Sequence, residues 1–431
     1  MFAQTPPPPP PPSIVVCILD DVSWEDLEAA ETPAIDVLRE EGLAFRGFHS
    51  MPVCSTTRVS LWTGRLPRRM GIGEGVNHYR VPGPFNPSPP MDLRTLPRIL
   101  AGEGFATCLV GKWHAGTFAV DGDVVPERSA LAVGGFVHWR AGTPANLQAG
   151  GGKGYKSWFR VDDGVGRVEK SYVTEAQAKA ATDWWQETSG PKLLAVALNT
   201  PHPPFHRPPD GWRRSANHGQ GRTGRYLAMV ESADLVVEKL RRACDDTTWF
   251  FLVSDNGTPP GVNGAAGRAK TTTLDRGVRV PLIATGPGID AKLRGTELDA
   301  LISCTDLYAT LAELAGAPVP ESGGGEDSLS FAAAFRQGSG FVGREFVVSE
   351  RYPSNPSNLG EGDDLMVRTA RWKLRVVDGV EAMYDLEEQP REGLPRDPTK
   401  LEGAPREAYE RLRAHLESLP PRPPLPVRRE R

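Results

Sequence analysis

The feature that most constrains the fold of this chain is a set of short runs that are apolar on both alternate faces. Each run is compact and rich in aliphatic residues, and polar segments with helical periodicity separate the runs. Strands buried on both sides of a parallel sheet have this pattern, whereas strands with one solvated face alternate. The runs are IVVCIL (14–19), ATCLVG (106–111), LLAVAL (193–198), WFFLV (249–253) and VPLIAT (280–285).

Two of the intervening segments have apolar residues at spacings of three and four, as expected of amphipathic helices: 33–42 and 224–246. The sequence therefore predicts an α/β fold, in which helices cover a mostly parallel central sheet. Residues 150–173 interrupt the pattern with glycines and a hairpin signal, and we expect them to form an excursion from the sheet.

The texture of the sequence changes after residue 328. Short strand-like runs follow, and then a helix-like segment at 406–419, which together indicate a small C-terminal α+β subdomain. The predicted organisation has four parts: a proline-rich disordered N-terminus at 1–13, the main α/β domain at 14–335, the C-terminal subdomain at 340–420, and a disordered tail at 421–431.

Composition excludes several classes of protein. The chain has 431 residues, 39% of them hydrophobic, and a net charge of -4 with both signs mixed along it, which argues against a nucleic-acid or membrane partner. Its 5 cysteines are scattered without a CxxC pair, so we expect neither a disulfide framework nor a zinc site. The first residues have no signal-peptide pattern, which predicts a cytoplasmic protein, or a periplasmic or secreted one if the true start lies upstream.

Acidic side chains follow two of the predicted strands. Asp20 and Asp21 come after the run 14–19, and Asp255 and Asn256 come just after 249–253. The carboxyl ends of parallel strands meet at one edge of a sheet, where two carboxylates about 4 Å apart repel by roughly 4 kcal/mol. These oxygen ligands favour Ca²⁺ or Mg²⁺ over zinc. An isolated acid pair in a solvated loop remains the plainer interpretation of Asp20 and Asp21 alone.

Cationic side chains lie near the ends of other predicted strands. Lys112 and His114 are two residues apart, so in an extended segment they would face the same site. His202 lies among prolines after a fourth strand, and Lys270 precedes a fifth. His202 is a candidate general acid. Taken singly, each of these residues is equally consistent with an ordinary surface or loop position.

The stretch CSTTR places Cys54 where a short helix is expected to begin, with Gly64 as its C-terminal stop. A helix N-terminus favours negative charge, and Arg58 is one turn further on, on the same face. The two residues could form an anion pocket around a reactive side chain. The alternative is a small buried cysteine beside a surface arginine.

Six motifs in this order resemble the sulfatase family of the alkaline phosphatase superfamily. They are LDD at 19–21, CSTTRVSLWTGR at 54–65, GKWH at 111–114, NTPHPPF at 199–205, SDNG at 254–257 and KTTTLDRGVRVP at 270–281. The C-terminal RTARWKLRVV and AMYDLEEQP also resemble the small C-terminal subdomain of that family.

The resemblance implies an alkaline phosphatase-like fold and hydrolysis of sulfate monoesters of an aryl, alkyl or sugar group. It implies that a formylglycine-generating enzyme oxidises Cys54 to formylglycine, whose hydrate attacks sulfur near Arg58. It further implies that His202 and Lys270 bind the sulfate and protonate the leaving alcohol, and that His114, helped by Lys112, then removes a proton. One divalent cation, usually Ca²⁺ with Mg²⁺ as the alternative, would contact modified Cys54 and lie among the acidic group: Asp20, Asp21, Asp255 and Asn256.

Two departures from the family pattern keep other functions open. Thr56 stands where the family has Pro or Ala, which bears on maturation and raises the alternative of an unmodified, catalytically silent binder of sulfated or phosphorylated ligands. Asp275 and Arg276 replace a Glu-Gly-Gly run near Lys270, on the substrate side. A phosphomonoester, phosphodiester or phosphonate hydrolase is the other alternative. The side chains near the motifs that could touch substrate are Trp113, Trp158, His206 and Arg276.

Overall fold

A computed structural model describes residues 10–76, 88–116, 129–215, 218–354 and 362–423. Ten described strands form one sheet in the order β11-β2-β10-β9-β1-β8-β4-β5-β6-β7. Strands β9, β1, β8, β4 and β5 run parallel to one another, which confirms the predicted mostly parallel sheet. The strands are β1 (Ile14–Leu19), β2 (Leu43–Phe45), β4 (Ala106–Lys112), β5 (His138–Thr143), β6 (Trp158–Asp162), β7 (Val165–Glu169), β8 (Lys192–Ala197), β9 (Trp249–Ser254), β10 (Leu282–Thr285) and β11 (Thr296–Leu298).

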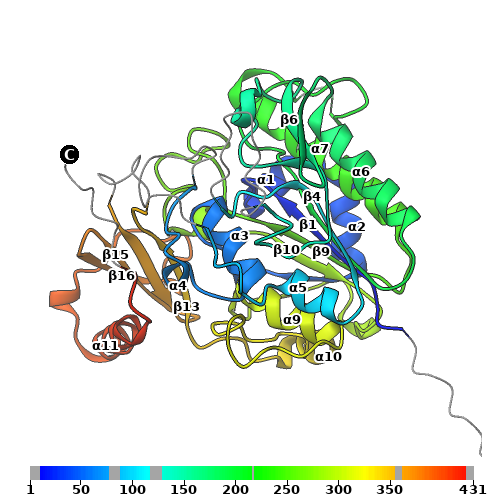
Figure 1. The fold of residues 1–431 in the computed structure, drawn as a ribbon. Helices are drawn as coiled ribbons and strands as arrows, with labels where there is room; N and C mark the ends of the chain where they lie inside the picture. Colours follow the sequence, from blue (N-terminus) through cyan, green and yellow to red (C-terminus); the bar gives the residue numbers. More distant parts are fainter. Residues whose placement is uncertain (1–9, 77–87, 117–128, 216–217, 355–361, 424–431) are drawn as a thin grey trace, which may run out of the picture.

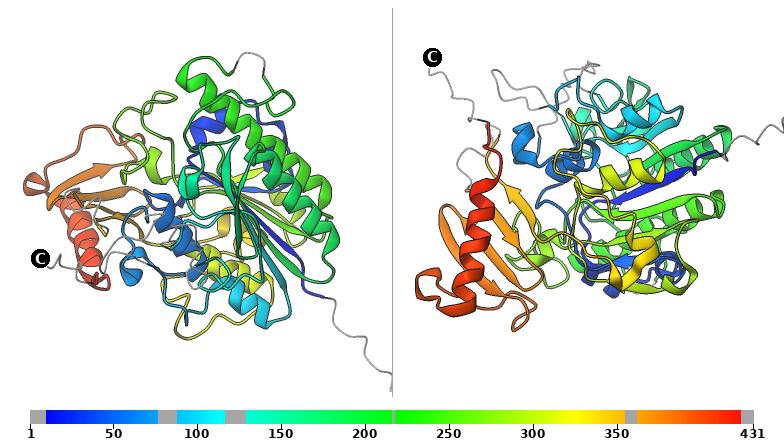
Figure 2. Two further views of the ribbon diagram at one scale, coloured as in Figure 1. Left: turned by 45° about the horizontal axis from the view of Figure 1, so that its top comes forward. Right: turned by 90° about the horizontal axis from the view of Figure 1, so that it is seen from below.

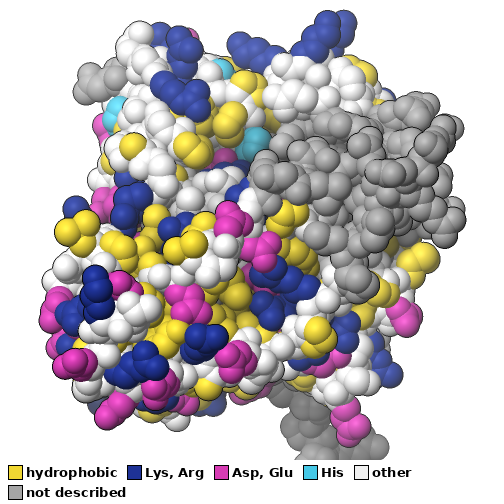
Figure 3. Space-filling model, turned by 90° about the vertical axis from the view of Figure 1, so that its left-hand side faces the viewer, with side chains coloured by type: hydrophobic (Ala, Val, Ile, Leu, Met, Phe, Trp, Pro, Cys, Tyr) yellow, Lys and Arg dark blue, Asp and Glu magenta, His cyan; other side chains and the backbone are white. Residues whose placement is uncertain are grey.

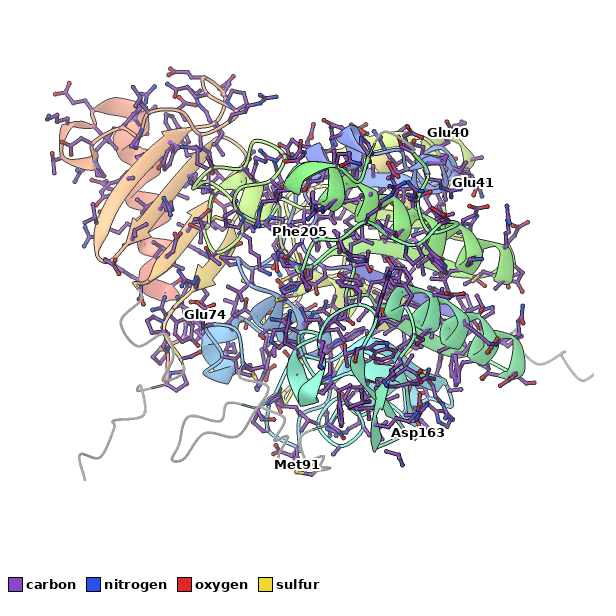
Figure 4. All side chains as sticks on the ribbon, turned by 90° about the horizontal axis from the view of Figure 1, so that it is seen from above. Glu40, Glu41, Glu74, Met91, Asp163 and Phe205 are labelled. Carbon is purple, nitrogen blue, oxygen red and sulfur yellow. The ribbon has the colours of Figure 1, made fainter. Side chains whose placement is uncertain are left out.

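Two details of the sheet differ from the prediction. Strand β10 is antiparallel to β9, because the loop after β9 stays at the carboxyl edge and the chain re-enters the sheet from that side. The hairpin of β6 and β7 is present but is no excursion, since Gly142 of β5 pairs with Val161 of β6 and the hairpin extends the sheet. In Figure 4, Asp163 at its turn lies on the opposite side of the domain from Glu40 and Glu41, which end the helix before β2.

Helices cover both faces of the sheet (Figures 1 and 2). Alternate residues of β1 enter two separate cores: Val15, Cys17 and Leu19 face the side of α2, α6 and α7, while Val16 and Ile18 face α3, α5 and α9. This explains why the strand runs are apolar on both faces. The helices are α1 (Trp24–Ala29), α2 (Pro33–Glu41), α3 (Cys54–Thr63), α4 (Pro67–Met70), α5 (Leu96–Gly102), α6 (Val173–Glu187), α7 (Gly221–Ala243), α8 (Asp275–Val278), α9 (Asp306–Leu314), α10 (Ala334–Gln337) and α11 (Gly403–Ser418).

A second, antiparallel sheet follows in the C-terminal part, beside the main sheet (Figure 1). Helix α11 packs on it around Leu374, Met383 and Leu412, so the predicted α+β unit is confirmed. Arg422, assigned to the tail from sequence, lies 4.3 Å from the ring of Tyr352. The strands are β13 (Val347–Arg351), β14 (Asp364–Arg368), β15 (Trp372–Val377) and β16 (Val380–Asp385), and a separate pair is β3 (Phe48–His49) with β12 (Ile302–Ser303).

The described surface agrees with the mixed charge of the sequence. Figure 3 shows Lys and Arg side chains intermingled with Asp and Glu over the face that it presents. All 5 cysteines are free, as predicted. Among the helices that the structure describes, none combines the length and the apolar character that crossing a membrane requires.

Buried His49 on β3 leads to a prediction about acid stability. Its Nδ1 lies 2.9 Å from the carbonyl oxygen of Gly47, and Arg368 Nη1 lies 3.4 Å from its Nε2. Burial, and then the charge of Arg368, lower the pKa of His49 to about 3. The ordinary pKa is about 6.5, so the unfolded chain binds more protons in between, and stability falls as the pH drops through this window.

Replacing His49 with Gln is therefore expected to flatten this dependence, by up to about 1.4 kcal/mol per pH unit. Urea unfolding near neutral pH and near pH 5 measures the difference, with His138→Gln at a partly exposed position as the control. An identical slope in wild type and His49→Gln would show that His49 is not the group that titrates.

Candidate functional site

The carboxyl ends of four parallel strands bring the predicted site residues to one place. Asp20 follows β1, Lys112 ends β4, His202 follows β8, and Asp255 follows β9. Cys54 reaches the same place from the first residue of α3. The ligand atoms of Asp20, Cys54 and Asp255 lie within 4.8 Å of one another. The sheet topology thus places these residues together at the carboxyl edge of the sheet, where the strand pattern predicted them.

Helix α3 presents Cys54 as the sequence predicted. Val53 is its extended N-cap, and Gly64 ends it in the left-handed region with φ 63°. Cys54 Sγ lies 3.7 Å from the Nζ atoms of both Lys112 and Lys270. Burial nevertheless raises the pKa of the Cys54 thiol, although the two lysines act in the opposite direction. The unmodified side chain is therefore not prepared as a thiolate nucleophile.

Each carboxylate of the site pairs with a cation, and Asp20 pairs with two, since Arg58 Nη2 also lies 3.9 Å from its Oδ2. Lys112 Nζ donates to Asp20 at 2.6 Å, and Lys270 Nζ donates to Asp21 at 2.5 Å. Burial and the charge of Asp20 raise the pKa of Asp255 to about 7. For Asp20, burial acts in the same direction, but nearby cations, foremost Lys112, outweigh it and hold the pKa of that carboxyl below its usual range. The three carboxylates of the site therefore face three cations, Arg58, Lys112 and Lys270.

Arg58 completes the pairing. Its Nε donates to Asp255 Oδ2 at 2.9 Å, and its Nη1 donates to the carbonyl oxygen of Lys112 at 2.8 Å. Arg58 is 1% exposed, so it is a deeply buried cation and not the surface arginine of the alternative interpretation. It ties α3 to β4 and β9.

The oxygen atoms of the acidic group fit a divalent cation. Asp20 Oδ1, Asp21 Oδ2 and Asn256 Oδ1 are buried and have no hydrogen-bond partner among the residues that the structure describes. Buried polar atoms are normally satisfied, so three orphan oxygens at one place are suitable ligands for a cation. Carboxylate and amide oxygens suit Ca²⁺ or Mg²⁺. The residues present are therefore able to hold the implied ion.

The backbone departs from the predicted extended form at one of the two histidines, His114. His114 has φ 48°, so the chain is not extended there, but its imidazole is still close enough to Lys112, Arg58 and Asp20 for their charges to act on it. Its Nε2 faces the carbonyl oxygen of Val76 at 3.2 Å, and burial, then Lys112, holds its pKa well below the ordinary value. His202 Nδ1 lies 2.8 Å from the carbonyl oxygen of Pro203. Burial lowers the pKa of His202 to about 4, with Asp20 acting against it.

The proposed substrate-contacting residues divide into two groups. Trp113 and Trp158 are 1% and 0% exposed, so they belong to the core and are not placed to touch a substrate. His206 is partly exposed and lies 4.3 Å from the ring of Tyr155. Arg276 is partly exposed, and it donates to the carbonyl oxygen of Asn263 at 2.9 Å. Only the last two remain candidates.

Supporting residues escaped the sequence analysis. The hydroxyl of Tyr226 of α7, which has one proton to donate, lies 2.7 Å from both the carbonyl oxygen of Asp21 and Asp26 Oδ2. Tyr155 likewise donates to the carbonyl oxygen of His202 at 2.8 Å. In the sequence, Asp26 looks like an ordinary acidic residue in the first turn of a helix. Nothing in the sequence around Tyr226 indicates that its hydroxyl contacts Asp26. These contacts fix the loops after β1 and β8.

Removing Arg58 is expected to destabilise the fold. Arg58→Met leaves the carboxylate of Asp255 buried without its cation, so we expect unfolding free energy to fall by about 3–5 kcal/mol. Urea unfolding in the presence of a chelator measures this loss. Arg69→Met, which removes a partly exposed pair with Asp327, is the matched control, with an expected loss of about 0–1 kcal/mol. Equal losses in the two variants would contradict the buried-pair account.

Comparisons with known proteins agree with this geometry. The chain is 30% identical to N-acetylgalactosamine-6-sulfatase of Sus scrofa, covering 75% of this chain and 66% of that protein. It is 29% identical to arylsulfatase A of Bos taurus, covering 70% of this chain and 63% of that protein. The chain thus spans about two thirds of the length of these curated relatives.

Solved structures support the same fold. The crystal structure of Ps i-CgsB aligns with a TM-score of 0.76 at 23% identity, over 94% of this chain and 92% of that one. The structure of BT4656 in complex with D-glucosamine-2-N,6-O-disulfate aligns with a TM-score of 0.75 at 18% identity, over 94% and 98%. The family model described as Sulfatase matches residues 12–317, and the chain belongs to the sulfatase family.

Proposed function

We propose that this protein hydrolyses sulfate monoesters with a nucleophile formed at Cys54 and one divalent cation. The observation that carries the proposal is the position of Cys54, with its Sγ 3.7 Å from two lysine ammonium groups and beside the acidic group with orphan oxygens. Burial raises the pKa of the Cys54 thiol, which disfavours the thiolate that a direct attack would need. Oxidation of Cys54 to formylglycine by a formylglycine-generating enzyme would provide a nucleophile at the same position.

The cofactors have defined roles in this proposal. Ca²⁺, or Mg²⁺ as the alternative, would be held by the acidic group and would supply positive charge against the ester and the carboxylates. Formylglycine, as its hydrate, would supply the attacking hydroxyl. Everything else is the work of side chains that the chain itself provides.

The cations of the site bind the sulfate group. Lys112 and Lys270 already converge on the position of Cys54 Sγ, and ammonium groups placed there stabilise charge on the sulfuryl oxygens. Arg58 favours the ionised form of Asp255, against the effects of burial and of Asp20, and orients its carboxylate. Because charge stabilisation is fixed in place before substrate arrives, little reorganisation is needed.

The two histidines move protons. His202 lies within reach of Asp20 and Asp21, and an incoming sulfate ester adds negative charge that favours its protonated form. It then protonates the leaving alcohol, together with Lys270. His114, buried and held neutral, is suited to accept a proton from the second hydroxyl of the hydrate, with Lys112 beside it, which would expel sulfate and restore the aldehyde. We propose a small aryl or alkyl sulfate or a sugar sulfate as the substrate.

Paired assays test the reaction class. The purified protein is given an aryl sulfate and the matching aryl phosphate, after metal removal and with Ca²⁺ or Mg²⁺ restored. We expect the sulfate ester to turn over faster. Faster turnover of the phosphate ester would instead support the phosphate or phosphonate hydrolase on the same scaffold.

A silent binder is a second candidate because of Thr56. Its Oγ1 donates to the carbonyl oxygen of Val53 at 2.6 Å, so the folded helix accommodates threonine well. Maturation, however, acts on the peptide before folding, where the proline of the family pattern is missing. Binding of sulfated ligands without turnover, together with an unmodified Cys54, would support this candidate.

A further inference from the structure

The segment that carries Lys270 lies between the two sheets. On the side of the site, Lys270 N donates to the carbonyl oxygen of Thr258 at 2.8 Å, and Thr271 N donates to that of Pro52 at 2.9 Å. Pro52 is two residues before Cys54. The backbone of Lys270 is thus registered against both the loop after β9 and the start of α3.

The C-terminal part of the chain grips the same segment from the other side. Asp364 of β14 accepts hydrogen bonds from Thr273 N at 3.0 Å and from Thr273 Oγ1 at 2.5 Å. Lys373 of β15 donates from Nζ to the carbonyl oxygen of Thr273 at 2.5 Å. Glu392 accepts from Asp275 N at 2.9 Å. We name Asp364, Lys373 and Glu392 the clamp.

The clamp is buried and charged. Lys373 is 0%, Glu392 2% and Asp364 4% exposed, and Lys373 forms an ion pair with Glu392. Burying such charges costs several kcal/mol unless their geometry and hydrogen bonds compensate, so a hydrophobic contact would be the cheaper way to join two sheets. An apolar contact does lie beside them, where Leu274 packs on Tyr384 and Leu386. The charged groups add directional hydrogen bonds that fix the position of the backbone at Thr273 and Asp275.

We propose that the clamp is a positioning device for Lys270, built into the C-terminal sheet and acting through residues 273–275. It sets where Lys270 Nζ stands relative to Cys54. The inference rests on the proposed function, in which Lys270 binds the sulfate group. Because only two residues separate Lys270 from Thr273, a displacement at Thr273 reaches Lys270. A displacement of about 1 Å can cost on the order of 100-fold in rate.

Two variants loosen the clamp. Asp364→Asn keeps the shape but replaces one acceptor oxygen by an amide nitrogen. Lys373→Met combined with Glu392→Gln removes both charges of the buried pair, while Asp275, which Lys373 also faces at 3.7 Å, keeps Arg279 and Arg368 as its cations. Arg371→Met is the matched control, because Arg371 pairs with Asp385 in the same sheet and has no hydrogen bond or ion pair to the Lys270 segment in the described structure. None of these residues touches the proposed substrate.

Three measurements on the full chain decide the matter: steady-state kinetics with an aryl sulfate, the affinity for inorganic sulfate, and amide hydrogen exchange of the peptide covering residues 268–278. In both clamp variants we expect a loss of roughly tenfold or more in kcat/KM, weaker sulfate binding, and faster exchange confined to that peptide. The control should match wild type in all three. Asp364→Glu, which restores the carboxylate, should recover part of the kcat/KM.

Two results would overturn the proposal. One is unchanged exchange of residues 268–278 in the clamp variants, since the clamp then holds nothing. The other is faster exchange with wild-type kcat/KM and sulfate affinity, since Lys270 then does not depend on the clamp. If wild type turns over none of an aryl, an alkyl and a sugar sulfate, the proposed function fails, while exchange and sulfate affinity still decide the role of the clamp.

Discussion

Replacing Cys54 with alanine is expected to lower kcat with an aryl sulfate by a factor of about 10⁴ or more, the scale seen when an enzyme loses its nucleophile. The physical reason is that the neighbouring groups can bind a sulfate ester but cannot attack it. Lys112 and Lys270 should still hold the anion, so the affinity for inorganic sulfate should change by much less. Steady-state kinetics and sulfate inhibition measure the two quantities.

The matched control is Cys244→Ala, at the C-terminal cap of α7 away from the site residues. It should retain wild-type kinetics. If Cys54→Ala retained most of the turnover, Cys54 would be the small buried cysteine of the alternative interpretation, and the nucleophile would have to be sought elsewhere.

Removing the divalent cation is expected to have the second largest effect, a fall in kcat of about 10² or more that Ca²⁺ restores. The fold should survive, because Arg58, Lys112 and Lys270 neutralise Asp20, Asp21 and Asp255 without the ion. Restoring Ca²⁺ at about 100 times its Kd should raise the free energy of unfolding by about 2.7 kcal/mol. Activity and urea unfolding after chelation, with and without Ca²⁺, test this.

Asp21→Asn removes one of the proposed ligands and should abolish the calcium-dependent gain in stability. Asp327→Asn, which changes an acid paired with Arg69 outside the acidic group, should leave that gain intact. Full activity in the presence of a strong chelator, or equal calcium responses in the two variants, would argue against a metal at these oxygens.

The sequence predicted the structure best where a local pattern of residues has a single structural explanation. The run at 14–19 is apolar on both faces because its alternate residues enter two cores, and that pattern is visible without a structure. Acids directly after such runs could be placed at one edge of the sheet by topology alone. The helix from Cys54 to its stop at Gly64 followed from local capping rules in the same way.

The sequence was least informative where tertiary context decides. The apolar run that forms β10 does not encode its direction, which follows from the loop before it remaining at the carboxyl edge. His114 has a left-handed backbone conformation, so the extended segment assumed in pairing it with Lys112 is absent, although the charges of Lys112, Arg58 and Asp20 all act on its imidazole. Lys373 reads as a surface lysine, and only its burial against Thr273 and Glu392 marks it as part of the clamp.

The measurement that tests the central claim most directly is mass spectrometry of the tryptic peptide 47–58, which contains Cys54, from protein made in its native host and active on an aryl sulfate. The account predicts an aldehyde at position 54 in the active protein, trapped by a hydrazine reagent. Its abundance should track specific activity across preparations. A free thiol at Cys54 in fully active protein would contradict the account.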